Sequence, residues 1–233
     1  PAYYMRRGLN AKVLPVLFSI SVILGNGVVY CMVQSNSIAG SFSGQAELPP
    51  LAIGVILVAL VGLVIFGGIK RLSTVASYIV PFMAFAYIIL ALVVLVTHAE
   101  WIAAMFRLII DSAFGVQQAA GGVLGYSVQE AFRYGVARGL FSNDAGAGTT
   151  PSMHAAANVK HPVNQGLSGM LGVFVTTIIV CSCTAFCILL SGALNGSLTG
   201  IQLTQAAFSS SFGDLGYWLV AAAMFLFGYT TLL

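Results

Sequence analysis

Five long apolar stretches limit the folds that this chain can adopt. They cover residues 13 to about 37, 51–69, 78–97, 167–191 and 215–233. A helix of about 20 apolar residues is long enough to cross the ~30 Å hydrocarbon layer of a bilayer. Charged residues make up only 6% of the 233 positions, against about a quarter in an ordinary soluble domain. We therefore predict an all-α, polytopic membrane protein with a single transmembrane domain over residues 1–233.

The apolar stretches lack the alternating polarity of β-barrel strands, so helices must satisfy their backbone amides within lipid. Four cysteines lie inside them: Cys31, Cys181, Cys183 and Cys187. A thiol in such a helix usually packs as a small apolar side chain. The 167–191 stretch has no histidine or acid that could complete a zinc site with its cysteines. We therefore expect these cysteines to pack, without a disulfide framework or a resident metal.

Lysines and arginines predict which loops face the cytoplasm, because loops rich in them stay inside. They lie before the first stretch, after the second and before the fourth: Arg6, Arg7, Lys12, Lys70, Arg71 and Lys160. The loops between these places carry acids or histidine, and we expect them to face outward: Glu47, His98, Glu100 and Asp214. This alternation requires one further crossing between Glu100 and Lys160.

The further crossing falls in residues 101–160, which are less apolar than the five stretches. Apolar residues recur at helical spacing over 101–114, with Arg107 and Asp111 four residues apart on another face. We expect an amphipathic helix there, lying on the outer surface. The crossing itself is predicted to start near residue 121, run through 126–136, break over 139–148 and resume over 153–158.

Residues 139–148 predict a discontinuous helix. The segment combines three glycines with three polar residues that favour leaving a helix: Gly139, Gly146, Gly148, Ser142, Asn143 and Asp144. A cytoplasmic loop between two helices has the same composition, but without a crossing here the flanking loops cannot both keep their sides. Broken helices inside a membrane line wet cavities, and transporters bind substrates and ions there.

The segment around the break also resembles a known family. The sequence Arg-Gly-Leu-Phe-Ser-Asn-Asp-Ala-Gly at 138–146, followed by His-Ala-Ala-Ala at 154–157 and His-Pro-Val at 161–163, is similar to the signature of the alanine or glycine:cation symporters. The resemblance implies sodium-coupled uptake of alanine or glycine across the plasma (inner) membrane. It implies the inverted-repeat, leucine-transporter-like fold of the amino acid, polyamine and organocation transporters. It also implies that the chain is an internal fragment, with preceding helices and the C-terminal helices missing.

The sequence departs from the family pattern at three places. Asp144 stands where glutamate is usual, Thr149-Thr150 replaces a Ser-Ala pair, and Thr176 stands where an aspartate is common. An ionisable residue inside a membrane is by default a functional candidate. The missing charge at Thr176 therefore bears on the coupling ion, and sodium and proton both stay open.

A small zwitterionic substrate needs donors for its carboxylate, acceptors for its ammonium and an apolar wall. Amides and carbonyls freed over residues 139–143 are expected to supply the polar groups, and Phe141 to close over the substrate side chain. The alternative for Phe141 is ordinary packing. The alternative for the side-chain amides of Gln34 and Asn36 in the first stretch is interhelical hydrogen bonding. The predicted substrate-binding residues are Gly139, Phe141, Ser142, Asn143, Gln34 and Asn36.

The predicted ligands of the coupling Na⁺ are Thr230 and Thr231 in the last stretch, because hard cations take oxygen ligands. The alternative is that both hydroxyls bond back to their own helix. No cofactor beyond the coupling ion is expected. The expected partners are the amino acid, sodium and membrane lipid, and without a basic stripe no nucleic acid.

Two other classes of membrane protein compete with a carrier. A membrane-embedded enzyme would need a catalytic constellation, and the sequence has no His-Glu-x-x-His, Gly-x-Ser-x-Gly or phosphate-binding glycine motif. A channel would need a ring-forming repeat or a pore loop, and neither is visible. The pattern therefore favours a transporter without enzymatic activity.

Overall fold

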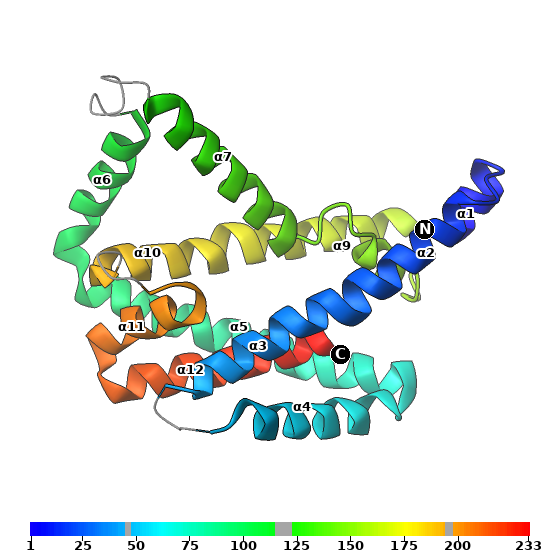
Figure 1. The fold of residues 1–233 in the computed structure, drawn as a ribbon, viewed down its shortest axis with the longest axis horizontal. Coiled ribbons are helices and arrows are strands. Elements are labelled where there is room, and N and C mark those ends of the chain that lie inside the picture. The colour runs from blue at the N-terminus through cyan, green and yellow to red at the C-terminus, as the bar shows by residue number, and fades with distance from the viewer. Residues whose placement is uncertain (45–47, 115–122, 194–197) are drawn as a thin grey trace. The chain divides into compact units, whose positions relative to one another are not determined.

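The described part of the chain consists of helices joined by turns and loops. The computed structural model describes residues 1–44, 48–114, 123–193 and 198–233. In this part the prediction of an all-α protein is confirmed. The predicted start of the further crossing near residue 121 lies outside it, as does Glu47, which is expected in an outer loop. The elements (Figure 1) are α1 (Ala2–Gly8), α2 (Leu14–Leu24), η1 (Gly25–Tyr30), α3 (Cys31–Phe42), α4 (Pro50–Ile65), α5 (Gly68–Thr97), η2 (Ala99–Trp101), α6 (Ile102–Phe114), α7 (Val123–Ser142), α8 (Thr149–His154), α9 (Pro162–Phe174), η4 (Val175–Cys181), α10 (Ser182–Ser191), α11 (Gly200–Phe212) and α12 (Asp214–Leu232).

These helices form two compact units. Unit 1 holds Pro1–Val28 and Ala103–Cys181, and unit 2 holds Val29–Ile102 and Ser182–Leu233. Two continuous rods, α2–η1–α3 and α9–η4–α10, pass from one unit to the other along the sequence. The boundary between the units falls within the π-helical segment η1 in the first rod and at the end of the π-helical segment η4 in the second. Such segments are rare inside helices and are frequent at functional sites.

Four helical rods are long and apolar enough to cross a membrane: Leu14–Phe42, Gly68–Thr97, Pro162–Ser191 and Asp214–Leu232. They correspond to four of the five predicted stretches. The fifth, α4, is also apolar but has 16 residues, about 24 Å at 1.5 Å per residue. Helix α7 has 20 residues and is not among the four that length and hydropathy select in the described chain. The further crossing therefore stays a prediction.

The structure corrects three predicted boundaries. Helix α4 ends at Ile65, and the positive φ of +74° at Gly68 lets the chain turn directly into α5. Helix α5 therefore starts well before residue 78 and includes Lys70 in its first turn. Helix α9 starts at Pro162 and not at 167, since proline suits a first helical turn. Apolar content alone does not mark these polar or proline-led helix starts.

Two shorter helices show what the sequence pattern can and cannot reveal. The amphipathic helix predicted over 101–114 is confirmed as α6, where Arg107 and Asp111 form an ion pair at 3.6 Å. Helix α11 was not predicted, because serines and glutamines interrupt its apolar residues. Its Phe208 side chain is nevertheless fully buried, so packing in unit 2 identifies it.

Unit 2 contains most of the buried core. Ile38 of α3 is fully buried and packs in one cluster with Ile53 and Leu57 of α4 and with partly buried Phe225 of α12. The fully buried ring of Phe208 lies 5.8 Å from the Tyr87 ring, measured between centroids. Helices from both ends of the unit's sequence therefore share one core.

Polar side chains also join the helices of unit 2. Gln205 of α11 is buried and its Nε2 donates to the Ser41 carbonyl at 2.8 Å. Ser41 lies in the last turn of α3, where carbonyls have no partner within the helix. The Tyr229 hydroxyl of α12 donates to the Leu60 carbonyl of α4 at 3.1 Å. These bonds satisfy groups that lipid could not.

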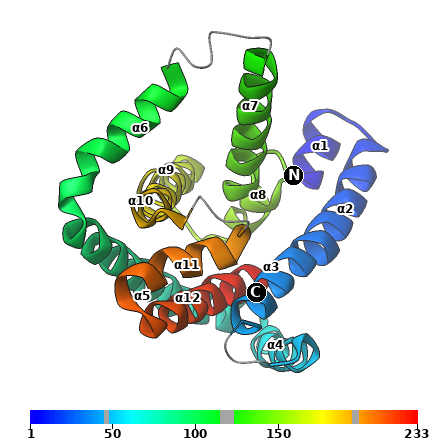
Figure 2. The same ribbon diagram turned by 60° about the vertical axis from the view of Figure 1, so that its left-hand side comes forward.

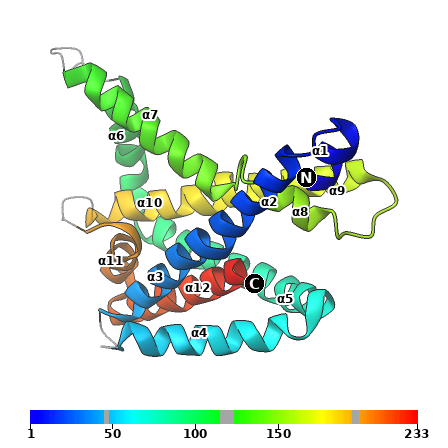
Figure 3. The same ribbon diagram turned by 45° about the vertical axis from the view of Figure 1, so that its right-hand side comes forward.

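Unit 1 buries few side chains. Among its described residues only Pro15 and Met105 are buried. Helix α1 folds back beside the start of α2, as Figures 2 and 3 show. Large apolar side chains such as Phe132 and Met170 are about 70% exposed. Exposed apolar area on this scale marks a surface that contacts membrane or protein.

Close packing at Gly216 gives a stability prediction. A Cβ at Gly216 would lie 2.4 Å from the Phe208 carbonyl oxygen, so Gly216→Ala forces α11 and α12 apart. We expect a loss of about 1–3 kcal/mol and a lower melting temperature of the purified full-length protein in detergent. Gly54→Ala in α4 is the control, since a Cβ there meets nothing within 4 Å. An equal melting temperature for Gly216→Ala and the wild type would contradict this packing.

Candidate functional site

The predicted helix break is present, over a shorter range than expected. Helix α7 continues through Ser142, residues 143–148 are not helical, and α8 starts at Thr149. The prediction that 139–142 unwinds is therefore wrong, as is the resumption over 153–158, because α8 ends at His154. A single glycine destabilises a helix by only about 1 kcal/mol, so Gly139 alone does not end α7.

Left-handed backbone conformations end the helix and shape the turn. The φ angles are +52° at Asp144, +85° at Gly146 and +81° at Gly148. A Cβ at Gly148 would also lie 2.5 Å from Cζ of Phe18 on α2. Glycine is favoured at both positions because it adopts positive φ at no steric cost. Asp144 is one of the few residue types that visit this region.

The last carbonyls of α7 are occupied by the turn itself. The Ala145 amide donates to the Leu140 carbonyl at 3.0 Å, and the Asp144 amide donates to the Phe141 carbonyl at 3.3 Å. The Gly139 carbonyl accepts from the Asn143 amide at 3.2 Å. The prediction that carbonyls over 139–141 are freed for a substrate is therefore wrong. The turn satisfies them as helix C-caps usually do.

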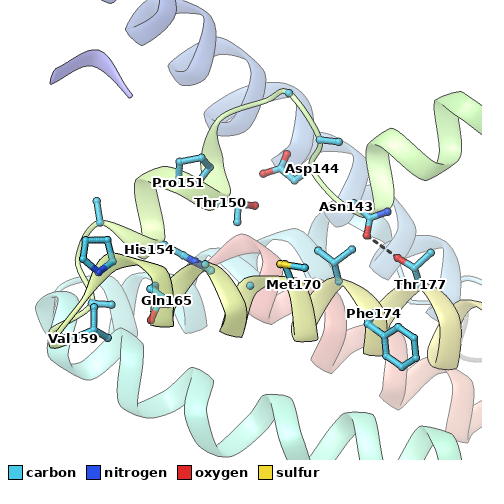
Figure 4. Close-up of a pocket in the computed structure, with 18 of the residues that line it drawn as sticks. Asn143, Asp144, Thr150, Pro151, His154, Val159, Gln165, Met170, Phe174 and Thr177 are labelled. Carbon is cyan, nitrogen blue, oxygen red and sulfur yellow. Dashed lines mark hydrogen bonds between the residues drawn. The ribbon is translucent and has the colours of Figure 1, made fainter. Parts of the chain in front are cut away.

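Asn143 ties the end of α7 to the π-helical segment η4. Its Nδ2 donates to the Gly139 carbonyl at 3.0 Å, and its Oδ1 accepts from the Thr177 hydroxyl at 2.7 Å. Figure 4 shows the second bond between the two side chains. The carboxamide thus uses a donor and an acceptor at once, and this fixes its orientation.

A cavity of about 1120 Å³ lies beside the break. Small-molecule sites usually measure about 300–1,000 Å³, so this cavity is large for one small amino acid. Figure 4 shows the break and α8 on one side of it and α9 with η4 on the other. Its polar lining comes from Asn143, Asp144, Thr150, His154, Gln165 and Thr177, and its apolar lining includes Met170, Val173, Phe174 and Ile178.

Two buried oxygens at this site have no hydrogen-bond partner among the described residues. They are Oδ1 of Asp144, which lines the cavity, and Oγ1 of Thr149. In Figure 4 the Asp144 carboxylate is directed toward α8 near Thr150. A buried acceptor without a partner costs about 1–3 kcal/mol, and more when it is charged. A cationic ligand in the cavity would remove that cost.

The structure brings only some of the predicted site residues together. Gly139, Phe141, Ser142 and Asn143 lie close together in the sequence of unit 1, and of these Asn143 alone is in the cavity lining. Gln34 and Asn36 lie on α3 and Thr230 and Thr231 on α12, all in unit 2.

The two predicted cation ligands bond back to their own helix. Thr230 Oγ1 donates to the Phe227 carbonyl at 2.9 Å, and Thr231 Oγ1 donates to the same carbonyl at 2.9 Å. The structure thus shows the alternative considered from the sequence, in which both hydroxyls bond to their own helix. Each hydroxyl oxygen keeps lone pairs that can still accept a cation, so the predicted role is untested.

Several lining residues were not predicted as site residues. Thr177 and Gln165 are polar residues in a largely apolar rod, but the rod holds other polar residues, so polarity alone did not single them out. His154 lies against Gly169, where an added Cβ would come within 2.8 Å of Cε1 of the His154 ring. Sequence spacing does not reveal that contact, because the two residues belong to different helices.

Comparison with known proteins identifies the family. The model of the sodium:alanine symporter family matches residues 1–233. The chain belongs to this family. Its members are transporters and not enzymes, and the long apolar helices agree with a multi-pass membrane protein. The resemblance found in the sequence is thereby confirmed.

Three relatives illustrate the range of names in the family. The chain is 41% identical to a putative sodium/proton-dependent alanine carrier protein, YrbD, of Bacillus subtilis, with 100% of this chain and 50% of that protein aligned. It is 41% identical to a probable sodium/glutamine symporter, GlnT, of the same organism, over 100% and 48%. It is 37% identical to a sodium/proton-dependent alanine carrier protein of Bacillus sp. PS3, over 91% and 50%. The chain thus spans about half the length of these relatives.

The Asn143–Thr177 bond predicts coupling between the two residues. In a double-mutant cycle of Asn143→Ala and Thr177→Val, we expect an interaction free energy of about 0.5–1.5 kcal/mol. The measurement is the unfolding free energy of the full-length protein in detergent. Thr176→Val is the matched control, because the Thr176 hydroxyl bonds only to carbonyls of its own helix. Additive effects of Asn143→Ala and Thr177→Val would contradict the bond.

Proposed function

We propose that the full protein containing this chain is a cation-coupled, most simply sodium-coupled, symporter of a small neutral amino acid, alanine or glycine, in the plasma membrane. The observation that carries the proposal is the buried, unpartnered carboxylate oxygen of Asp144 at a cavity beside a broken helix. Irregular backbone of this kind is where transporters bind substrates and ions. The description of the family as sodium:alanine symporters supports the same proposal.

Asp144 is the proposed acceptor for the substrate ammonium. Its carboxylate lines the cavity and has an oxygen free of protein partners. A hydrogen bond from an ammonium to a carboxylate is charge-assisted and about twice as strong as a neutral one. This assignment replaces the carbonyls over 139–141, which the turn occupies.

The substrate carboxylate is proposed to accept from the Gln165 side chain, which lines the cavity from α9. An amide N–H that donates to a carboxylate forms a charge-assisted hydrogen bond. The two ends of a zwitterion would then find an acceptor at Asp144 and a donor at Gln165.

The apolar wall would decide which side chain is accepted. Met170, Val173 and Phe174 line the cavity from α9, and Phe141 is proposed to add to this wall. One methylene in an apolar pocket changes binding by only about 1–3 kcal/mol. The large cavity and the glutamine named in one relative make a graded preference the expected outcome, with alanine and glycine preferred.

Six further residues are proposed to keep the roles predicted from the sequence. Gln34 and Asn36 are proposed to contact the substrate through their carboxamides, and Gly139 and Ser142 through the last turn of α7. Thr230 and Thr231 are proposed as oxygen ligands of the coupling cation. Hydroxyl oxygens suit Na⁺ because hard cations prefer oxygen.

Removal of the Asp144 charge tests this proposal. In the full-length protein, Asp144→Asn should raise the KM for alanine about 10- to 100-fold, which corresponds to losing a charged hydrogen bond of about 1.5–3 kcal/mol. Asp144→Glu keeps the charge and should retain much of the uptake. The measurement is sodium-driven uptake of labelled alanine into vesicles.

The control variant is Asp111→Asn, which removes the same charge from an exposed ion pair on α6. It should leave uptake near the wild-type level. Asp144→Asn with an unchanged KM for alanine would show that this carboxylate does not bind the substrate.

A further inference from the structure

A second cavity lies between α1 and the start of α2, within unit 1. It measures about 880 Å³. One end is lined by Arg6, Asn10 and Lys12, and the other by an apolar strip of Val16, Ile20 and Ile23. We call it the α1–α2 groove. Figures 2 and 3 show the fold-back of α1 beside α2 that creates it, and the positive φ of +48° at Asn10 lies in that turn.

The basic end of the groove is not neutralised by the protein. Residues 1–46 contain three basic residues and no acid, and the groove lining contains no acid. Arg6 and Lys12 are exposed and take part in no ion pair within the described chain. The distribution of lysines and arginines places this end on the cytoplasmic side. Anionic lipids give the cytoplasmic leaflet a negative surface that attracts such residues.

The apolar strip has the length and direction of an acyl chain. Val16, Ile20 and Ile23 are spaced four and three residues apart, so they lie on one face of α2. Each is at least 50% exposed. From Leu14 to Ile23 helix α2 rises about 14 Å at 1.5 Å per residue. Half of the ~30 Å hydrocarbon layer is about the same.

We propose that the α1–α2 groove binds one anionic phospholipid of the cytoplasmic leaflet. Its phosphate lies between Arg6 and Lys12, and one acyl chain follows Val16, Ile20 and Ile23. A soluble anion would use the basic end and leave the strip uncovered. A zwitterionic lipid would cover the strip, but its cationic headgroup would lie against two basic side chains. An anionic phospholipid satisfies both ends.

The chain offers a matched pair for the charged end. Arg6 lines the groove and Arg7, its neighbour on α1, does not. Arg6→Gln and Arg7→Gln remove the same charge from the same helix, so a general attraction to a negative membrane would weaken equally in both. A site in the groove predicts that Arg6→Gln weakens lipid binding about fivefold and that Arg7→Gln leaves it near wild type.

A second matched pair tests the apolar strip. Val16 lines the groove, whereas Leu17 is equally exposed at 56% and does not line it. Val16→Trp should fill the strip and abolish the lipid effect. Leu17→Trp adds the same bulk outside the groove and should preserve it. This pair needs no change of charge, so it decides the question even if Arg6→Gln fails to fold.

The experiment measures lipid-dependent melting of the purified full-length protein in detergent, titrated with phosphatidylglycerol, phosphatidylcholine or glycerol phosphate. Phosphatidylglycerol should raise the melting temperature of the wild type, Arg7→Gln and Leu17→Trp, and should have a much smaller effect on Arg6→Gln and Val16→Trp. Phosphatidylcholine and glycerol phosphate should have little effect on any of them.

Three results would overturn the proposal. They are equal stabilisation by phosphatidylcholine, equal stabilisation by glycerol phosphate, and indistinguishable responses within both matched pairs. The readout does not involve transport, so it stands apart from the amino-acid site.

Discussion

The fold of this chain depends on how it satisfies polar backbone groups where water is scarce. Lipid offers no hydrogen-bond partners, so a helix can end there only if protein groups take over its free amides and carbonyls. The end of α7 is predicted to lie at membrane depth, and there the turn over 143–148 and the Asn143 carboxamide, which bonds to Gly139 and Thr177, supply the partners. In unit 2, Gln205 does the same for the last turn of α3.

The same requirement explains why an unpartnered acceptor remains beside the break. The turn satisfies the carbonyls of α7, but it leaves the Asp144 carboxylate with an unpartnered oxygen in a cavity. The left-handed conformations at Asp144, Gly146 and Gly148 hold the acid there, and Phe18 leaves no room for a side chain at Gly148. A buried acceptor without a partner costs about 1–3 kcal/mol, and the ammonium of the proposed substrate would offset that cost.

Helix type, most spans and the presence of a break could be predicted, because apolar length and glycine content are local properties of the sequence. The exact helix ends could not be, since Pro162 and Gly68 act through caps and turns that an apolar pattern ignores. Helix α11 depends on the burial of Phe208 by neighbours that are distant in sequence. Asn143 was predicted in the site, but its partner Thr177 lies 34 residues away, and no spacing rule links two such residues. The inverted-repeat fold stays a prediction.

The central claim is that the cavity beside residues 143–148 holds the transported amino acid. Its most direct test is labelling of a single cysteine at Ala145, which is exposed and lines the cavity, in an otherwise cysteine-free full-length protein. Ala104→Cys on the exposed part of α6 is the control. We predict that alanine with sodium slows labelling at 145 by a thiol reagent and leaves labelling at 104 unchanged. Labelling at 145 at the same rate with and without alanine and sodium would contradict the account.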